Sequence, residues 1–329
     1  MTLTKAQPQT RRHKVLSVLT VLNIILLCVL ILAETFIGER RWYTALLTYF
    51  PQQLFVLPTL LLLLWTIFGK AWRTAGWNVL TLCVAAVTLL GVNIPLALPR
   101  AEGVHFRMMT YNIDRAIMGP QKIWDVVDRR QPDIVCLQEV DNPAFWQKLP
   151  PNWNHVADAE VALFSRFPIV SYARHPVRNS HRVLLSAVID IHGKRVTIID
   201  AHLSTAVRGE SLSHHTGTLA AYLRQTTSIR EQQIDALLRL AATSPYPVII
   251  AGDFNTPPRG VLYRRMGRHF QDAFRVAGWG PGYSYPTRFP LMRIDYLFLD
   301  PRLHARSCWT PAEKASDHRP FFAEIDLGK

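Results

Sequence analysis

Two polar side chains, Asp253 and Asn255, follow a short apolar run at residues 247–250 and precede two prolines. The apolar run predicts a buried strand, and the prolines predict its end. A carboxylate and an amide two residues apart at a strand end can contact the same small anion or metal-bound water. An ordinary Asp/Asn turn produces the same pattern, so this segment alone leaves both interpretations open.

The same arrangement, a polar side chain at one end of an apolar run, recurs along the chain. These further side chains are Asn112, Glu139, His202, Asp295, Asp317 and His318. Carboxylate, amide and imidazole groups of this kind can hold a hard divalent cation and supply acid and base groups. Cysteine is absent from these positions, which disfavours zinc. The pattern therefore predicts a site for a divalent cation beside acid–base groups.

The order of the short motifs resembles the endonuclease/exonuclease/phosphatase superfamily over roughly residues 104–327. The motifs are Tyr-Asn, Leu-Gln-Glu, His-Leu, Gly-Asp-Phe-Asn, Ile-Asp-Tyr and Ser-Asp-His. The resemblance implies an α+β fold, a four-layer α/β/β/α sandwich with the site at one edge of its two sheets. It also implies hydrolysis of phosphoesters with Mg²⁺, for which Mn²⁺ is an alternative.

The resemblance further implies which residues bind the metal and orient the substrate. Glu139 resembles the principal metal-binding carboxylate of the family, and Asn112 and Asp317 resemble its neighbours in the metal shell. Asp253 and Asn255 match the pair that orients the attacking water and the phosphoryl oxygens.

Two histidines and one aspartate complete the catalytic set that the resemblance implies. His318 matches the catalytic histidine, and Asp295 matches the carboxylate that orients it. His202 matches a second histidine, which the abasic-site nucleases of the family lack. This histidine argues against an abasic-site repair enzyme.

Three other side chains are candidate substrate contacts. Arg166 follows an apolar run and could reach a phosphate, although a solvated surface charge is the more frequent role. His214 lies in a polar loop, where it lines the substrate entrance or is simply solvent-exposed. Tyr285 belongs to an aromatic loop at residues 278–286, which suits a lipid surface, base stacking or a cover for the core.

The first hundred residues have a different composition from the rest. Residues 15–33, 46–68 and 77–98 are apolar enough to predict three transmembrane helices. A signal sequence explains only the first segment, and buried core helices of a soluble domain are the other alternative. We expect a basic cytoplasmic tail (1–14), a membrane segment (15–98), a linker (99–104) and a catalytic domain (105–329).

Positive charges in the tail and the second loop predict the orientation of this membrane segment. Both are expected in the cytoplasm, although Arg40 and Arg41 in the first loop weaken the contrast. Three spans then place the catalytic domain outside, in the periplasm of a Gram-negative cell, on a multi-pass inner-membrane protein. The charges are Lys5, Arg11, Arg12, Lys14, Lys70 and Arg73.

The net charge of +13 suits an anionic ligand. The first hypothesis is a membrane-anchored phosphoesterase acting on a phosphate ester or pyrophosphate that is linked to a lipid. Bacterial members of the family with a three-helix layout are associated with undecaprenyl pyrophosphate, which points the same way. The second hypothesis is a membrane-tethered nuclease acting on DNA or RNA. A non-catalytic scaffold is disfavoured because all the catalytic side chains are present.

Overall fold

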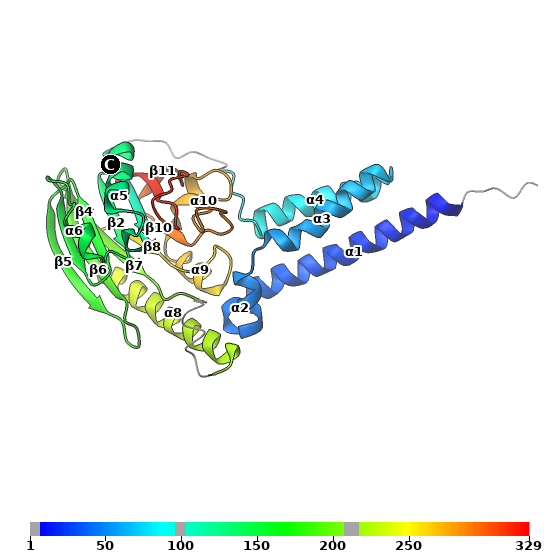
Figure 1. The fold of residues 1–329 in the computed structure, drawn as a ribbon, viewed down its shortest axis with the longest axis horizontal. Helices are drawn as coiled ribbons and strands as arrows, with labels where there is room; N and C mark the ends of the chain where they lie inside the picture. Colours follow the sequence, from blue (N-terminus) through cyan, green and yellow to red (C-terminus); the bar gives the residue numbers. More distant parts are fainter. Residues whose placement is uncertain (1–6, 96–102, 207–216, 329) are drawn as a thin grey trace, which may run out of the picture.

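The computed structural model describes residues 7–95, 103–206 and 217–328. An α/β sandwich domain forms one end of the molecule, and a group of long helices projects from it (Figure 1). The helices precede the sandwich in the sequence. They are α1 (Gln7–Phe36), the short η1 (Gly38–Arg40), α2 (Trp42–Tyr49), α3 (Gln53–Phe68) and α4 (Trp72–Thr88).

The sandwich domain contains two six-stranded mixed sheets. The first has the order β11 (His304–Trp309), β12 (Phe321–Asp326), β1 (His105–Asn112), β2 (Ile134–Gln138), β4 (Val161–Ser165) and β3 (Asn154–Asp158). The second has the order β5 (Ile169–Pro176), β6 (Val183–Ile191), β7 (Lys194–His202), β8 (Val248–Asp253), β10 (Asp295–Leu299) and β9 (Gln271–Asp272). The inner faces of the two sheets share one apolar core that includes Met108, Ile198 and Leu297.

Helices cover the outer face of each sheet. The first sheet packs against α5 (Pro120–Arg130) and α6 (Pro143–Trp146), and the second against α8 (Leu219–Ala242) and α9 (Val261–Met266). The short α10 (Ala273–Ala277) and η2 (Asp114–Ala116) complete the domain. This is the predicted α/β/β/α sandwich of an α+β fold.

Strand directions explain how distant motifs meet. Each sheet contains one parallel pair, β1 with β2 and β7 with β8, and His202 is level with Asp253 in the second pair. Parallel strands end at the same edge of a sheet, whereas an antiparallel neighbour begins there. Asp295 starts β10 opposite Asp253, and β12 starts opposite the end of β1. Each sheet therefore brings both strand ends and strand starts to one edge.

The prediction of three transmembrane helices is wrong in the form given. Only α1, with 30 residues, is by itself long and apolar enough to cross a membrane in the described part of the chain. The second predicted span is broken near Pro51 into α2 and α3, whose axes differ by 64°, and this pair would count as at most one more span. The third begins at Trp72 and ends at Thr88, after 17 residues, because the chain then turns at the left-handed Gly91 towards the sandwich.

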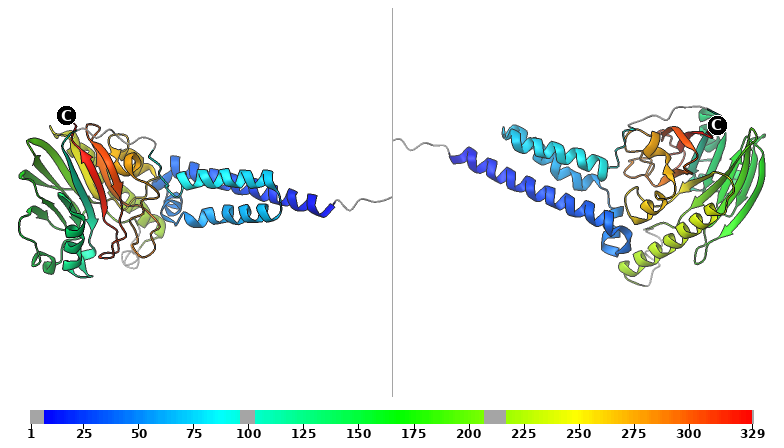
Figure 2. Two further views of the ribbon diagram at one scale, coloured as in Figure 1. Left: turned by 90° about the horizontal axis from the view of Figure 1, so that it is seen from above. Right: turned by 180° about the vertical axis from the view of Figure 1, so that it is seen from behind.

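The helices α1, α3 and α4, which we call the helical stalk, lie side by side and project away from the sandwich (Figure 2). Polar side chains pair inside the stalk: Asn23 donates to Thr59 (2.9 Å) and Asn78 donates to Thr20 (3.0 Å). Many apolar side chains instead point outward, for example Leu26, which is 61% exposed. Paired polar groups inside and apolar groups outside suit a lipid environment.

Arg259 joins the helices to the sandwich. Its Nε lies 3.4 Å from Oε2 of Glu34, and its guanidinium donates to the carbonyls of Thr48 (2.6 Å) and Leu89 (3.3 Å). Glu34 also accepts a hydrogen bond from Gln52 (3.0 Å). The Glu34 side chain is 2% exposed and the Arg259 side chain is 11% exposed, so each charge depends on the other for compensation.

Replacing Arg259 by alanine is therefore expected to destabilise the junction. Removing one partner of a buried ion pair costs about 3–5 kcal/mol, because the other charge stays buried without compensation. The midpoint of thermal unfolding of the detergent-solubilised protein should fall by several degrees. Arg302→Ala is the matched control, since Arg302 pairs with Asp300 at the surface. Equal midpoints for the two variants would contradict this role of Arg259.

Candidate active site

A cleft of about 340 Å³ lies at the edge where the strand ends meet. It combines carboxylate, amide and imidazole groups with a partly apolar wall. Its lining residues include Tyr49, Asn112, Asp114, Glu139, Ala206, Asp253, Asn255, Tyr285, Met292, Ile294, Asp317 and His318. The structure therefore brings most of the residues singled out in the sequence into one cavity.

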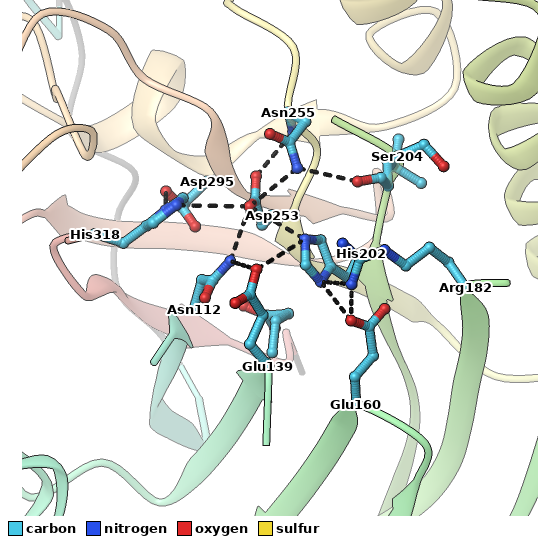
Figure 3. Close-up of polar contacts among 12 residues, drawn as sticks. Asn112, Glu139, Glu160, Arg182, His202, Ser204, Asp253, Asn255, Asp295 and His318 are labelled. Atoms are coloured by element: carbon cyan, nitrogen blue, oxygen red, sulfur yellow. Dashed lines mark hydrogen bonds and ion pairs between the residues drawn. The ribbon is translucent and has the colours of Figure 1, made fainter. Parts of the chain in front are cut away.

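Asp253 lies at the centre of the polar cluster (Figure 3). Its side chain is 1% exposed and accepts hydrogen bonds from Nδ2 of Asn112 (3.1 Å) and from both the backbone (2.8 Å) and the side chain (3.2 Å) of Asn255. Nε2 of His202 lies 3.5 Å from Oδ2 of Asp253, and Nε2 of His318 lies 3.7 Å from it. Four side chains from different elements thus converge on one buried carboxylate.

The backbone at these strand ends is locally strained. Glu139, Asp114 and Asn255 adopt left-handed conformations, with φ of 59°, 45° and 47°. Such a residue other than glycine costs roughly 1–2 kcal/mol. Gly252 is required for another reason, because a Cβ there would clash with the carbonyl of Ala201 on the neighbouring strand. These sharp turns allow the side chains to leave the sheet and enter the cleft.

Asp295 and His318 form a buried pair. Oδ2 of Asp295 is 2.9 Å from Nδ1 of His318. Burial lowers the pKa of His318, but Asp295 and Asp253 more than offset this and raise the pKa to about 10. Burial raises the pKa of Asp253 to about 7, although the positive charge of His318 opposes it. His318 is therefore a cationic donor at neutral pH, whereas Asp253 can exchange a proton there.

His202 is neutral, in contrast to the cationic His318. Burial, and then the positive charge of Arg182, lower the pKa of His202 well below its ordinary value. Nη1 of Arg182 lies 2.8 Å from Nδ1 of His202 and can only donate, so Nδ1 accepts. The proton of the neutral ring then sits on Nε2, which faces Asp253. His202 is thus a buried, neutral hydrogen-bond donor that faces Asp253.

Arg182 and Glu160 were missed by sequence reasoning. A carboxylate oxygen of Glu160 contacts Arg182 closely and lies 3.3 Å from Nδ1 of His202. Both residues directly precede an apolar run, which is the pattern that identified His318. The same signal would have found them if single charged residues at strand starts had been included.

Three half-buried carboxylates, those of Asp114, Glu139 and Asp317, face the cleft near Asn112. Burial, and then the charges of Asp317 and Glu139, raise the pKa of Asp114 to about 6. Glu139 accepts a long hydrogen bond from Asn112 (3.3 Å). A cation bound here would relieve the repulsion among these carboxylates. Mg²⁺ suits the position because it takes oxygen ligands and needs only one or two carboxylates. Asp114 is a further candidate ligand that was not predicted.

A second cluster has metal-ligand geometry. Ligand atoms of Asp253, Asp295 and His318 all lie within 4.8 Å of one another. The imidazolium already compensates the carboxylates there, and Nδ1 is occupied by Asp295. The uncompensated charge lies near Glu139, so that end of the cleft is the better cation site.

The three predicted substrate contacts differ in their outcome. Tyr285 lies in the cleft, with its ring centroid 4.8 Å from that of His318. Arg166 lies at the opposite edge of the sheet, because β4 runs antiparallel to β2, and it donates to the carbonyl of Pro132 (3.1 Å). This position removes Arg166 from the site. His214 lies outside the described residues.

Comparison with known proteins gives one family. A model described as "Endonuclease/Exonuclease/phosphatase family" matches residues 109–318. "Uncharacterized protein YbhP" of Escherichia coli (strain K12) is 25% identical over 251 residues, which cover 68% of this chain and 96% of YbhP.

Solved structures share the fold of the sandwich domain. The human Nocturnin catalytic domain with bound sulfate anion is 19% identical, with a TM-score of 0.53 over 70% of this chain and 98% of that one. D. rerio TDP2 complexed with single strand DNA product is 18% identical, with a TM-score of 0.53 over 68% of this chain and 99% of that one.

The charge state of His318 can be tested with Asp295→Asn. Removing the negative charge should lower the pKa of His318 by about one pH unit or more, because burial then opposes protonation with less compensation. The measurement is an NMR titration of histidine ring signals in metal-free protein, with His318→Gln identifying the signal. Asp300→Asn, outside the cleft, should leave it unchanged. An unaltered titration in Asp295→Asn would show that Asp295 does not hold the proton on His318.

Proposed function

The chain belongs to the endonuclease/exonuclease/phosphatase family, and we propose that it is a Mg²⁺-dependent phosphoesterase acting on a lipid-linked phosphate ester or pyrophosphate. Family membership makes it a phosphoric ester hydrolase that depends on a divalent metal. The observation that carries the proposal is the cleft that Asp253, His318 and Glu139 line together, with Nε2 of His318 3.7 Å from Asp253 and with no Lys or Arg paired with Glu139 among the described residues.

The metal is expected at the Glu139 end of the cleft, with Asn112, Asp114 and Asp317 nearby. When bound, Mg²⁺ would reduce the negative charge of the phosphoryl group and so favour attack by water. Proton transfer is then assigned to Asp253 and His318, and His202 donates a hydrogen bond.

Asp253 is the proposed proton acceptor. Its pKa of about 7 is close to neutral pH, where a general base works best. Asn255, fixed by its hydrogen bonds to Asp253 and to the carbonyl of Leu203 (3.0 Å), orients the water beside the carboxylate. The water oxygen forms a bond to phosphorus while its proton passes to Asp253.

The two histidines act as donors on the substrate. As the bond from phosphorus to the leaving oxygen breaks, the imidazolium of His318 supplies a proton to that oxygen. The Nε2 proton of His202 donates a hydrogen bond to a non-bridging oxygen. This division follows from the opposite pKa shifts of the two rings.

Glu139→Gln is expected to abolish Mg²⁺-dependent hydrolysis while the protein stays folded. Losing a ligand should reduce kcat/KM by about 100-fold or more, since a metal supplies several kcal/mol of charge stabilisation. Glu324→Gln is the matched control, because Glu324 pairs with Arg107 away from the cleft. Calorimetric titration with Mg²⁺ should show weaker binding only for Glu139→Gln. Near-normal metal-dependent turnover in that variant would refute the assignment.

The substrate class is tested by a parallel assay of the purified protein. Phospholipid, polyprenyl pyrophosphate and plasmid DNA are supplied under the same Mg²⁺ conditions. The lipid substrates should be hydrolysed with the higher kcat/KM. Faster cleavage of plasmid DNA would favour the nuclease alternative. DNA is included because the chain is similar in fold to TDP2, whose structure holds a single strand DNA product.

We also propose that the stalk lies in the inner membrane, with α1 as the helix that crosses it and α3 and α4 packed beside α1, and with the sandwich on the outer side. The loop between α3 and α4 meets the start of α1, where Nε2 of His13 is 2.9 Å from the carbonyl of Gly69. The basic residues of both segments therefore share the end of the stalk farthest from the sandwich. Positively charged ends stay in the cytoplasm, which would place the active site outside. The basic residues are Arg11, Arg12, Lys14, Lys70 and Arg73.

Reporter fusions test this orientation. Alkaline phosphatase fused after Lys329 should be active, whereas a fluorescent protein that folds only in the cytoplasm should stay dark there. The same reporters fused after Lys70 should give the reverse pattern and serve as the internal control. An inactive phosphatase together with a fluorescent reporter after Lys329 would show that the sandwich faces the cytoplasm.

A further inference from the structure

We propose that Tyr49, at the end of α2, is a substrate-positioning residue and that the helical part of the chain forms one wall of the active site. This wall would select a phosphoester with an apolar chain. The inference rests on the proposed function, because it concerns the substrate of the same cleft. It assigns a binding role to a segment that otherwise looks like an anchor.

Tyr49 lies in the wall of the active-site cleft. It lines the same cleft as Asp253 and His318, although it is more than 50 residues from the start of the sandwich domain. Its side chain is only partly buried, so it contributes surface to the cavity. Among the lining residues it is the one that comes from the helical part.

Arg230 on α8 fixes the tyrosine ring in place. Nη1 of Arg230 contacts the hydroxyl of Tyr49, and the guanidinium lies 5.0 Å from the centre of its ring. Nη1 also lies 3.3 Å from the carbonyl oxygen of Asn255, which belongs to the catalytic cluster. Arg230 is fully buried. One buried cation therefore contacts both the Tyr49 side chain and the backbone of Asn255.

Other contacts also attach the helices to the sandwich. Arg259 already holds α1, α2 and the end of α4 through Glu34 and two backbone carbonyls. The backbone of Val261 donates to Glu39 at the same junction (2.7 Å). A partly exposed tyrosine in the cleft is therefore better explained by contact with a ligand than by docking alone.

The surface next to Tyr49 indicates an apolar ligand chain. Phe50, Leu54, Leu57 and Leu61 are between 46% and 57% exposed and follow a spacing of four, three and four residues. By this spacing Leu54, Leu57 and Leu61 lie on one face of α3, so an apolar stripe runs along that helix. Phe50 lies between Tyr49 and the stripe in the chain, before the bend from α2 to α3.

The sandwich adds aromatic side chains at the same junction. Trp279 is 73% exposed and Phe289 is 67% exposed. Both belong to the segment that meets the helices, where Gln53 donates to the hydroxyl of Tyr283 (3.1 Å) and Asn93 pairs with Gly280. Exposed aromatic rings of this kind are typical of a membrane–water interface. A phosphate in the cleft and a chain along α3 would both be accommodated by one amphiphilic phosphoester.

The test compares two phosphates that differ only in their apolar part. Binding of methyl phosphate and of octyl phosphate is measured by calorimetric titration with the full-length chain in detergent and Mg²⁺. Tyr49→Ala should weaken octyl phosphate about tenfold, the loss expected when about two methylene groups lose buried contact, and leave methyl phosphate within about twofold. Tyr43→Ala is the matched control, because Tyr43 lies on the same helix, is 49% exposed and is absent from the cleft lining.

Two results would overturn the proposal. Unchanged octyl phosphate binding in Tyr49→Ala would remove the role of the ring, and equal losses for both phosphates would assign Tyr49 to structure alone. If the variant does not fold, the wild-type chain is irradiated with octyl phosphate that carries a terminal diazirine. Labelling should fall within residues 49–61, and labelling elsewhere alone would contradict the inference. These tests measure binding, so a lack of hydrolysis would count against the proposed function and not against Tyr49.

Discussion

The structure of the active site depends on the burial of one carboxylate, Asp253, where the two sheets meet. A buried charge of this kind is tolerated only if nearby groups donate hydrogen bonds or carry the opposite charge. Here Asn112 and Asn255 donate to it, and His202 and His318 lie within 4 Å. These groups come from both sheets, so the register between strands and the packing between sheets must both be correct before the charge is compensated.

Charge balance also divides the chemistry between the two sides of the cleft. Asp295 keeps the proton on His318, whereas burial, together with the positive charge of Arg182, lowers the pKa of the neighbouring His202 and keeps it neutral. Towards Glu139 the carboxylates repel one another, and burial together with this repulsion raises the pKa of Asp114. One side is thus balanced within the protein, and the other requires a cation. The junction with the helices also reaches the active site, because Arg230 contacts both Tyr49 and the backbone of Asn255.

The sandwich fold and its motif residues could be predicted because the signals are local. An apolar run that ends in a polar residue marks a strand end, and the resemblance supplied the order of the strands. Arg166 was misplaced because the direction of β4 cannot be read from its own residues. The contacts of Arg182, Glu160 and Tyr49 depend on tertiary packing, which no single segment encodes.

The helical part shows a different limit of sequence reasoning. Hydropathy found the apolar segments but not the break near Pro51 or the early end of α4. The early end of α4 follows from the need to return the chain to the sandwich, where Asn93 pairs with Gly280. A hydropathy average cannot detect that constraint, because it depends on a contact almost 190 residues away in the sequence.

The central claim is that the cleft holds its cation at the Glu139 end, beside a metal-free cluster of Asp253, Asp295 and His318. Anomalous X-ray scattering from crystals soaked in Mn²⁺ tests it directly, because Mn²⁺ can replace Mg²⁺ and scatters anomalously. We expect one strong peak within coordination distance of Glu139 and of at least one of Asn112, Asp114 and Asp317. A peak held by Asp253, Asp295 and His318, or no peak in the cleft at saturating Mn²⁺, would contradict the account.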